Sequence, residues 1–358
     1  MRKPALPELC KKAYKQGRRL VAPLVGFPGV EMTGTTIKLA QQNYGEHYKA
    51  VKTLATTFKP DLALPLMDLS VEANAVGRYT VFPENDSATV PKAKFHPDML
   101  DGLTDIHVSF DSRLISYVET MKLMSLGLPK DIVKGAYVAG PYTLAALIMG
   151  ADDAALATVT EPALLERLCE FATAKIQEYT RQLIAAGAEL ICILEPTSVM
   201  LGAKHFERFS AQYVRHITRS CRYSGVNTVY HVCGNTMHLT EIMAQAGVSG
   251  ISLDSADVGI DLPEAARRAG EDVVVIGNIN PTGAILRGTP EQVRGEVDAL
   301  LEAMEPYPNF LLSTGCDLPQ ETPLDNIHAF MEAGRAWHIG QGKTKPSAHK
   351  SRKQTCLL

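Results

Sequence analysis

The sequence predicts a (β/α)8 barrel, a fold of class α/β, and three observations support this prediction. Eight short apolar runs rich in Val, Ile and Leu recur along the 358 residues, and each run is followed by turn residues. The runs are nearly continuous in apolar character, which is typical of parallel strands buried on both faces. Segments with helical periodicity separate them, so that strands and helices alternate through a chain of suitable length.

The predicted elements follow one another most regularly after residue 130. The eight predicted strands are Leu20–Phe27, Asp61–Met67, Gly135–Gly140, Glu189–Leu194, Asn227–Val232, Val248–Leu253, Asp272–Ile276 and Asn309–Ser313. Helices are predicted over Pro162–Ala186, Phe206–Arg222, Met237–Ala246 and Pro290–Met304, where apolar residues recur about every 3.6 positions. Several of the helices end in an Ala-Gly pair, in which glycine supplies the left-handed stop before the next strand.

The stretch between the second and third predicted strands is longer than one βα unit requires. Residues 70–134 contain a polar stretch, Arg78–Lys94, and a predicted helix around Asp111–Leu126. We interpret 70–134 as an insertion that acts as a lid over the barrel. One barrel domain is expected over residues 1–340, followed by a basic, disordered tail at 341–358. A doubly wound two-domain protein is the alternative, but no glycine-rich phosphate-binding motif follows the first predicted strand.

Composition narrows the classes of function. The chain has 36 Lys and Arg against 39 Asp and Glu, a formal net charge of −3, which gives no support to nucleic-acid binding. No apolar run approaches the roughly 20 residues needed to span a bilayer, and the N-terminus lacks the apolar stretch of a signal peptide. The seven cysteines argue against a disulfide framework because their number is odd. We expect a soluble, cytoplasmic protein without a membrane partner.

Three residues at the predicted strand ends form a pattern that fits zinc. His231 and Cys233 end the fifth predicted strand, and their alternating spacing places both side chains on one side of it. Cys316 follows the eighth predicted strand and therefore reaches the same rim of the barrel. Sulfur ligands favour zinc or copper over magnesium or calcium, and three protein ligands leave a fourth position open, as in catalytic zinc sites. The alternative is that these residues are ordinary core side chains.

Longer motifs relate the chain to a known family. They are Leu64–Gly77, Gly140–Thr143, Tyr230–Asn235, Gly277–Pro281 and Ser313–Pro323. With these motifs the chain resembles the uroporphyrinogen decarboxylase superfamily, and within it the cobalamin-dependent methyltransferases that act on thiols such as coenzyme M. The resemblance implies a zinc-dependent methyltransferase with Zn2+ on His231, Cys233 and Cys316. It also implies a methylated corrinoid such as methylcobalamin as the methyl donor and a small thiol as the acceptor.

The chain departs from the decarboxylases at two places. Phe27–Gly34 stands where those enzymes carry an R-Q-A-G-R motif, and Gly315-Cys316-Asp317 stands where they carry Gly-His-Gly. A substrate with eight carboxylates would lack the arginines that receive it. Asp68 matches their catalytic aspartate, but the methyltransferases keep a similar run, so this catalytic candidate does not discriminate. A porphyrinogen decarboxylase, a methyltransferase acting on homocysteine or a folate, and a non-catalytic corrinoid-binding barrel remain alternatives.

Other predicted rim residues complete the candidate site. Asp254 and then Glu195 are candidates for the fourth metal position, and Asp317 is a candidate for holding its loop or orienting His231. Tyr142, Asn235 and Asn278 are candidate pocket residues, and Arg78, His96 and Arg113 are candidates to meet an anionic acceptor or the corrinoid. No corrinoid-binding D-x-H-x-x-G motif occurs, so the corrinoid is expected on a separate protein that docks transiently over the rim.

Overall fold

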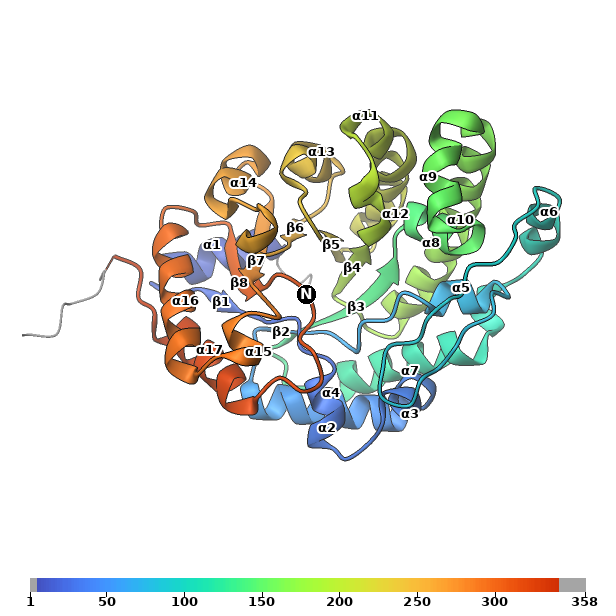
Figure 1. Cartoon of the computed structure of the whole chain (residues 1–358). Coiled ribbons are helices and arrows are strands. Elements are labelled where there is room, and N and C mark those ends of the chain that lie inside the picture. Colours follow the sequence, from blue (N-terminus) through green and yellow to red (C-terminus); the bar gives the residue numbers. More distant parts are fainter. Residues whose placement is uncertain (1–4, 341–358) are drawn as a thin grey trace, which may run out of the picture.

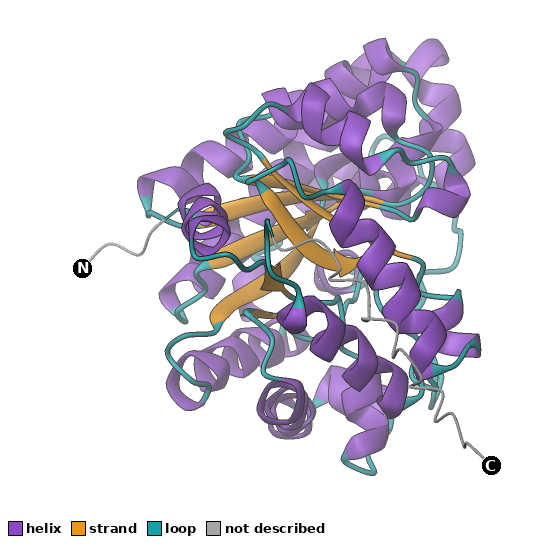
Figure 2. Cartoon of the chain, turned by 90° about the vertical axis from the view of Figure 1, so that its left-hand side faces the viewer, coloured by secondary structure: helices purple, strands orange, loops and turns teal. Residues whose placement is uncertain are grey.

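Eight parallel strands form the centre of the structure, a computed structural model that describes residues 5–340. Helices surround the strands in the view of Figure 1, and the perpendicular view in Figure 2 shows the same arrangement. The predicted (β/α)8 barrel is therefore confirmed. The predicted tail at 341–358 lies outside the described residues.

All eight predicted strands are present. They are β1 (Leu20–Val21), β2 (Leu62–Ala63), β3 (Val133–Ala139), β4 (Leu190–Leu194), β5 (Asn227–Val232), β6 (Gly250–Leu253), β7 (Val274–Ile279) and β8 (Phe310–Thr314). The sheet runs in the order β1-β8-β7-β6-β5-β4-β3-β2. Between its two ends, the amide of Asp61 donates to the carbonyl of Val21 over 3.0 Å, and the amide of Val21 donates to the Asp61 carboxylate over 2.8 Å. These two bonds bring the first and last strands of the sheet together into a nearly closed barrel.

The helices occupy the connections between strands. They are α1 (Leu6–Lys15), α2 (Pro28–Met32), α3 (Ile37–Gln42), α4 (Tyr44–Phe58), α5 (Val71–Ala75), α6 (Met99–Thr104), α7 (Ser112–Gly127), α8 (Pro141–Met149), α9 (Ala151–Thr160), α10 (Pro162–Ala185), α11 (Ala203–Phe206), α12 (Gln212–Tyr223), α13 (Thr240–Gln245), α14 (Leu262–Ala269), α15 (Ala284–Arg287), α16 (Pro290–Ala303) and α17 (Leu324–Ala336). A π-helical turn, Glu207–Ala211, lies between α11 and α12, within the helix predicted over Phe206–Arg222.

Two apolar layers hold the barrel together, because successive side chains of a strand point to opposite faces. One layer fills the interior of the barrel and includes Tyr137, Cys192 and Leu194. The other, much larger layer lies between the strands and the surrounding helices and includes Tyr142 and Tyr230. The interior layer forms the floor beneath the C-terminal strand ends.

The inserted segment is anchored beside the barrel helices that follow β3. Helix α7 confirms the helix predicted around Asp111–Leu126. Arg78 donates from Nε to the carbonyl of Leu147 in α8 over 3.1 Å, and Lys175 of α10 donates to the carbonyl of Thr104 over 2.9 Å. Figure 1 shows α6 at the right-hand edge, next to α9 and α10. A lid function of this segment stays a prediction.

Within residues 5–340, no single helix is long and apolar enough to cross a membrane. The pair α8 and α9 passes the same test of length and composition when taken together, with a bend of 105° between them.

Candidate metal centre

The predicted ligand residues converge at one end of the barrel. His231 and Cys233 stand at the end of β5, and Cys316 stands two residues after β8. The Nε2 atom of His231 lies 3.1 Å from Sγ of Cys233 and 3.8 Å from Sγ of Cys316, and the two sulfur atoms are 3.5 Å apart. Over the part of the chain that the structure describes, this is the one group of three or more His, Cys, Asp or Glu side chains with spacing suited to a metal ion.

The separations between the donor atoms fit a tetrahedral zinc ion. Zinc–sulfur bonds of about 2.3 Å and zinc–nitrogen bonds of about 2.0 Å place sulfur atoms about 3.8 Å apart, and nitrogen about 3.5 Å from sulfur. The observed S···S separation of 3.5 Å and N···S separations of 3.1 and 3.8 Å are close to these values. The donor set of one imidazole and two thiolates also matches the ligand chemistry of zinc.

The contact between the two thiols shifts their pKa values in opposite directions. The hydrogen bond from Cys233 lowers the pKa of Cys316 well below its ordinary value, with a further contribution from His231. The same bond, together with burial, raises the pKa of Cys233. Cys316 is therefore the more acidic thiol of the pair, and a cation between the sulfur atoms would favour the thiolate form of both.

Ser252 contacts the imidazole of His231 and was not among the residues predicted from the sequence. Its Oγ lies 2.9 Å from Nδ1 of His231, and both side chains are 1% exposed. A metal ion bound at Nε2, which faces the sulfur atoms, would require the proton of the neutral ring on Nδ1, where the Ser252 hydroxyl is the acceptor within reach. Such bonds fix the tautomer and the ring orientation of metal-binding histidines. The strand register could have indicated this contact, because His231 and Ser252 are direct partners between β5 and β6.

Asp254 holds the turn after the ligands. Its Oδ2 accepts from the amide of Gly234 over 2.7 Å, and its Oδ1 accepts from the amide of Ser255 over 2.6 Å. The side-chain amide of Asn278 donates to the carbonyl of Asp254 over 2.9 Å. Asn235 is exposed at the rim, where its Oδ1 accepts from the amide of Met237 over 3.4 Å. Asp254 and Asn278 thus lie beside the cluster and shape its backbone, but Asp254 is not a member of the ligand group.

Asp317 holds its own loop, as one of its two predicted roles requires. Its Oδ1 accepts from the amides of Gly26 and Leu318, each over 3.0 Å. Burial raises the pKa of Asp317 to about 7, while these amides and that of Met67 favour the carboxylate. The residue after Cys316 is thereby tied to the loops that follow β1 and β2. Its predicted role toward His231 falls instead to Ser252.

Glu195 and Tyr142 are not brought to the cluster. The Glu195 carboxylate is buried and accepts from the amides of Tyr142 and Thr143, at 2.9 and 2.7 Å, and from the hydroxyl of Ser210 at 2.8 Å. It stabilises the N-terminus of α8, where unpaired amides favour an anion. Tyr142 packs in the outer apolar layer and is fully buried. The structure does not support a metal-binding Glu195 or a pocket-lining Tyr142.

The predicted anion-binding residues are engaged elsewhere. Arg113 forms a buried ion pair with Asp68 and is 7% exposed, so the structure does not support its predicted contact with an anionic acceptor or the corrinoid. Arg78 donates to the carbonyls of Leu147 and Pro91. His96 is exposed. Asp68, the catalytic candidate, therefore meets an arginine of the protein itself rather than the metal cluster.

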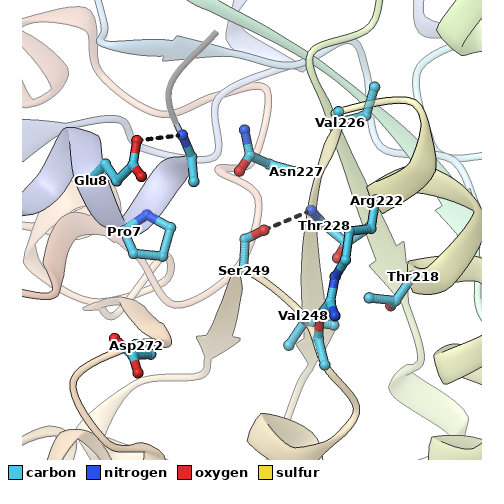
Figure 3. A pocket seen from close by; sticks show the side chains of 13 residues that line it. Pro7, Glu8, Thr218, Arg222, Val226, Asn227, Thr228, Val248, Ser249 and Asp272 are labelled. Carbon is cyan, nitrogen blue, oxygen red and sulfur yellow. Dashed lines mark hydrogen bonds between the residues drawn. The ribbon is translucent and has the colours of Figure 1, made fainter. Parts of the chain in front are cut away.

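A separate cavity of about 580 Å3 lies at the opposite end of the barrel (Figure 3). It opens beside α1 and the starts of β5 and β6, where the amide of Thr228 donates to Ser249 over 3.3 Å. The side-chain oxygen of Asn227 accepts from the amide of Leu6 over 2.8 Å, which fixes α1 there. In barrels of this kind the N-terminal face contributes to stability, and chemistry takes place at the C-terminal face. The metal cluster therefore remains the candidate functional site.

Relatives of known sequence fall into two groups. The methylcobamide:CoM methyltransferase MtbA of Methanosarcina acetivorans is 30% identical over 230 residues, 63% of this chain and 64% of that protein. MtaA of Methanosarcina barkeri, also a methylcobamide:CoM methyltransferase, is 24% identical over 62% of this chain and 63% of its own length. The matches thus span a little under two thirds of these methyltransferases. A uroporphyrinogen decarboxylase of Prochlorococcus marinus is 22% identical over 86% of this chain and 87% of its own.

A solved structure shares the fold of this chain, and a family model identifies its family. A methyltransferase structure from Methanosarcina mazei superposes with a TM-score of 0.82 at 20% identity, covering 93% of this chain and 98% of that one. The family model for uroporphyrinogen decarboxylase (URO-D) matches residues 31–337, most of the chain. The chain therefore belongs to the uroporphyrinogen decarboxylase (URO-D) family.

Proposed function

We propose that this protein is a zinc-dependent methyltransferase that moves a methyl group from a methylated corrinoid to a thiol. The observation that carries the proposal is the convergence of His231, Cys233 and Cys316 within 3.8 Å of one another at the C-terminal face. Three protein ligands leave room for one further ligand, which is the arrangement of catalytic rather than structural zinc sites. The names of the methyltransferase relatives support the same reaction.

The chain's own residues would hold and shape the metal. His231 would bind through Nε2, with the Ser252 hydroxyl as the acceptor for a proton on Nδ1. Cys233 and Cys316 bind as thiolates, and their two negative charges make the centre electron-rich. When bound, zinc lowers the pKa of an acceptor thiol so that its sulfur is present as the nucleophilic thiolate.

Methyl transfer balances without an added oxidant or reductant. The methyl group leaves cobalt without its bonding electrons, so methyl-Co(III) becomes Co(I). The acceptor sulfur supplies the electron pair of the new carbon–sulfur bond, and the proton of the thiol is released. The floor of the site, formed by Tyr137, Cys192 and Leu194, is apolar, and exclusion of water strengthens the electrostatic interactions of the reacting groups.

The partner protein, the acceptor thiol and the cellular location are also proposed. The corrinoid is expected on a separate protein, since the sequence carries no corrinoid-binding motif of its own. Coenzyme M is the first acceptor to test because the relatives named above act on it, and homocysteine is the second. A cytoplasmic location stays a prediction.

The decisive experiment is metal analysis of protein purified without added metal, combined with a methylcobalamin–thiol assay. The wild type is expected to carry about one zinc per chain, and Cys233→Ala is expected to lose both zinc and methyl transfer. Cys192→Ala is the matched control. Cys192 is a barrel-interior cysteine near the cluster that is not one of the three predicted ligands, and burial raises its pKa.

The two variants separate the possible outcomes. Loss of zinc in Cys233→Ala but not in Cys192→Ala supports the ligand assignment. A wild type that binds no zinc when it is offered would refute the proposed mechanism and favour a decarboxylase or a binding role instead. Zinc at full stoichiometry without methyl transfer to any thiol would refute the reaction and leave the metal site standing.

A further inference from the structure

Both carboxylate oxygens of Asp68 accept two hydrogen bonds each, whereas a carboxylate that takes up a proton in catalysis needs a free lone pair. Its Oδ1 accepts from the amide and the hydroxyl of Ser70, at 2.9 and 2.7 Å. Its Oδ2 accepts from the hydroxyl of Tyr117 at 2.7 Å and from the guanidinium of Arg113. A carboxylate offers about four lone-pair directions, and all four are used. The side chain is 1% exposed, so water does not replace these partners.

Arg113 is as tightly enclosed as its partner. It stands in the first turn of α7, with 7% of its side chain exposed. The ring of Phe82, from the inserted segment, stacks with its centroid 4.7 Å from the guanidinium carbon, and the ring of Tyr117 lies at 5.9 Å. A guanidinium stacked on an aromatic face and paired with a carboxylate has a fixed orientation. The pair thus joins the inserted segment, α7 and the loop after β2.

The loop that carries Asp68 contacts the apolar layer inside the barrel and lies close to Asp317, the neighbour of Cys316. Met67 and Leu69, the neighbours of Asp68, pack against the apolar layer inside the barrel. The same loop touches the cluster's support, because a Cβ at Gly26 would lie 3.0 Å from Cα of Leu66 and 3.4 Å from the Asp317 carboxylate. Met67 comes directly before Asp68 and Leu69 follows it in a turn, so fixing Asp68 fixes the backbone that carries both apolar side chains.

We propose that Arg113 and Asp68 form a positioning pair that sets Met67 and Leu69 as the apolar wall of the acceptor-thiol site. Asp68 then takes no proton in the reaction, although its sequence position matches a catalytic aspartate. The carbon chain of the thiol packs on this wall while its sulfur meets the metal cluster. The inference rests on the proposed function for the identity of its ligand, a small thiol.

A double-mutant cycle tests the pair. The variants are Asp68→Asn, Arg113→Met and the combination of both, each loaded with Co2+ in place of zinc. The measured quantity is the Kd of coenzyme M, read from the thiolate-to-cobalt absorption. Each single variant leaves one buried partner unmatched and is expected to raise Kd about tenfold, whereas the neutral double variant is expected to return to within about threefold of the wild type.

Several controls make the cycle decisive. Asp101→Asn breaks an exposed ion pair that joins α6 of the inserted segment to Arg167 of α10 without reaching the loop, and it is expected to leave Kd unchanged. If Arg113→Met does not fold, Phe82→Leu removes the stacked ring while keeping both charges, and a smaller rise in Kd is expected. An unchanged Kd in Phe82→Leu would then count against the pair.

Other outcomes would separate a positioning role of Asp68 from a catalytic one. A double variant as weak in thiol binding as the worse single variant would overturn the positioning role. So would an Asp68→Asn protein that binds the thiol normally but loses kcat without rescue by Arg113→Met, because that result would make Asp68 catalytic. A wild type that binds cobalt and thiol but transfers no methyl group refutes the proposed function alone. A wild type that binds no metal overturns both.

Discussion

Replacing Ser252 by alanine gives the sharpest test of how the metal centre is built. The change removes the acceptor 2.9 Å from Nδ1 of His231, at a place where both side chains are 1% exposed. A buried N–H without a partner costs about 1–3 kcal/mol. Because the correct tautomer of His231 is needed for binding through Nε2, this cost falls on the metal complex. We expect zinc affinity to fall about 5- to 150-fold, a range that overlaps measured effects of such partners.

The assay is competition for zinc between the protein and a chromophoric chelator at fixed pH. Ser313→Ala is the matched control, since this buried serine lies on β8 and its hydroxyl has no partner among the described residues. The control is expected to bind zinc as tightly as the wild type. Equal zinc affinity in Ser252→Ala and the wild type would refute the assignment of Nδ1 as the proton-bearing nitrogen held by Ser252.

Two further predictions concern stability. Burial raises the pKa of Glu72 from 4.5 to about 7, so the folded protein keeps a proton that the unfolded chain releases. This contribution to stability is fully present below pH 4.5 and is lost as the pH rises through about 7. Relative to the wild type, Glu72→Gln is therefore expected to gain up to about 3 kcal/mol between pH 5 and pH 8 in denaturant unfolding. A pH-independent difference for Glu72→Gln would contradict the expectation. Gly140→Ala places a Cβ on the buried Glu195 side chain and is expected to destabilise the fold by about 1–3 kcal/mol, measured as a lower Tm. Gly295 has open space around it, so Gly295→Ala is the control and should not lower the Tm. An unchanged Tm in Gly140→Ala would show that the Glu195 side chain moves aside freely.

The apolar runs predicted the strands well because parallel strands buried on both faces contain few polar residues. Asn227–Val232 was predicted to the residue. The runs Leu20–Phe27 and Asp61–Met67 were too long as strands, since β1 and β2 contain two residues each. After those residues the chain remains apolar but leaves the sheet to cover the mouth of the barrel, and hydrophobicity alone does not distinguish these two environments.

The site residues could be predicted from the sequence where the geometry of a strand alone determines which way their side chains point. His231 and Cys233 share a face because side chains alternate along a strand, and their cluster with Cys316 follows from the closure of the barrel. Glu195 also ends a strand, but the amides at the start of α8 capture its carboxylate. Asp68 turns toward Arg113, which lies 45 residues further along the chain. Such long-range partners leave no periodic pattern in a single sequence.

The distance along the chain between the ligands has a consequence for biosynthesis. Cys233 and Cys316 are 83 residues apart in sequence, so a growing chain has two of the three donors long before it has the last. Fragments that stop before Cys316 offer two donors and hold a metal ion weakly, even if the first strands have already formed. If the cluster binds zinc as proposed, zinc content would report whether a molecule was made to its last strand and closed into a barrel, and tight metal retention would distinguish complete molecules from abortive ones.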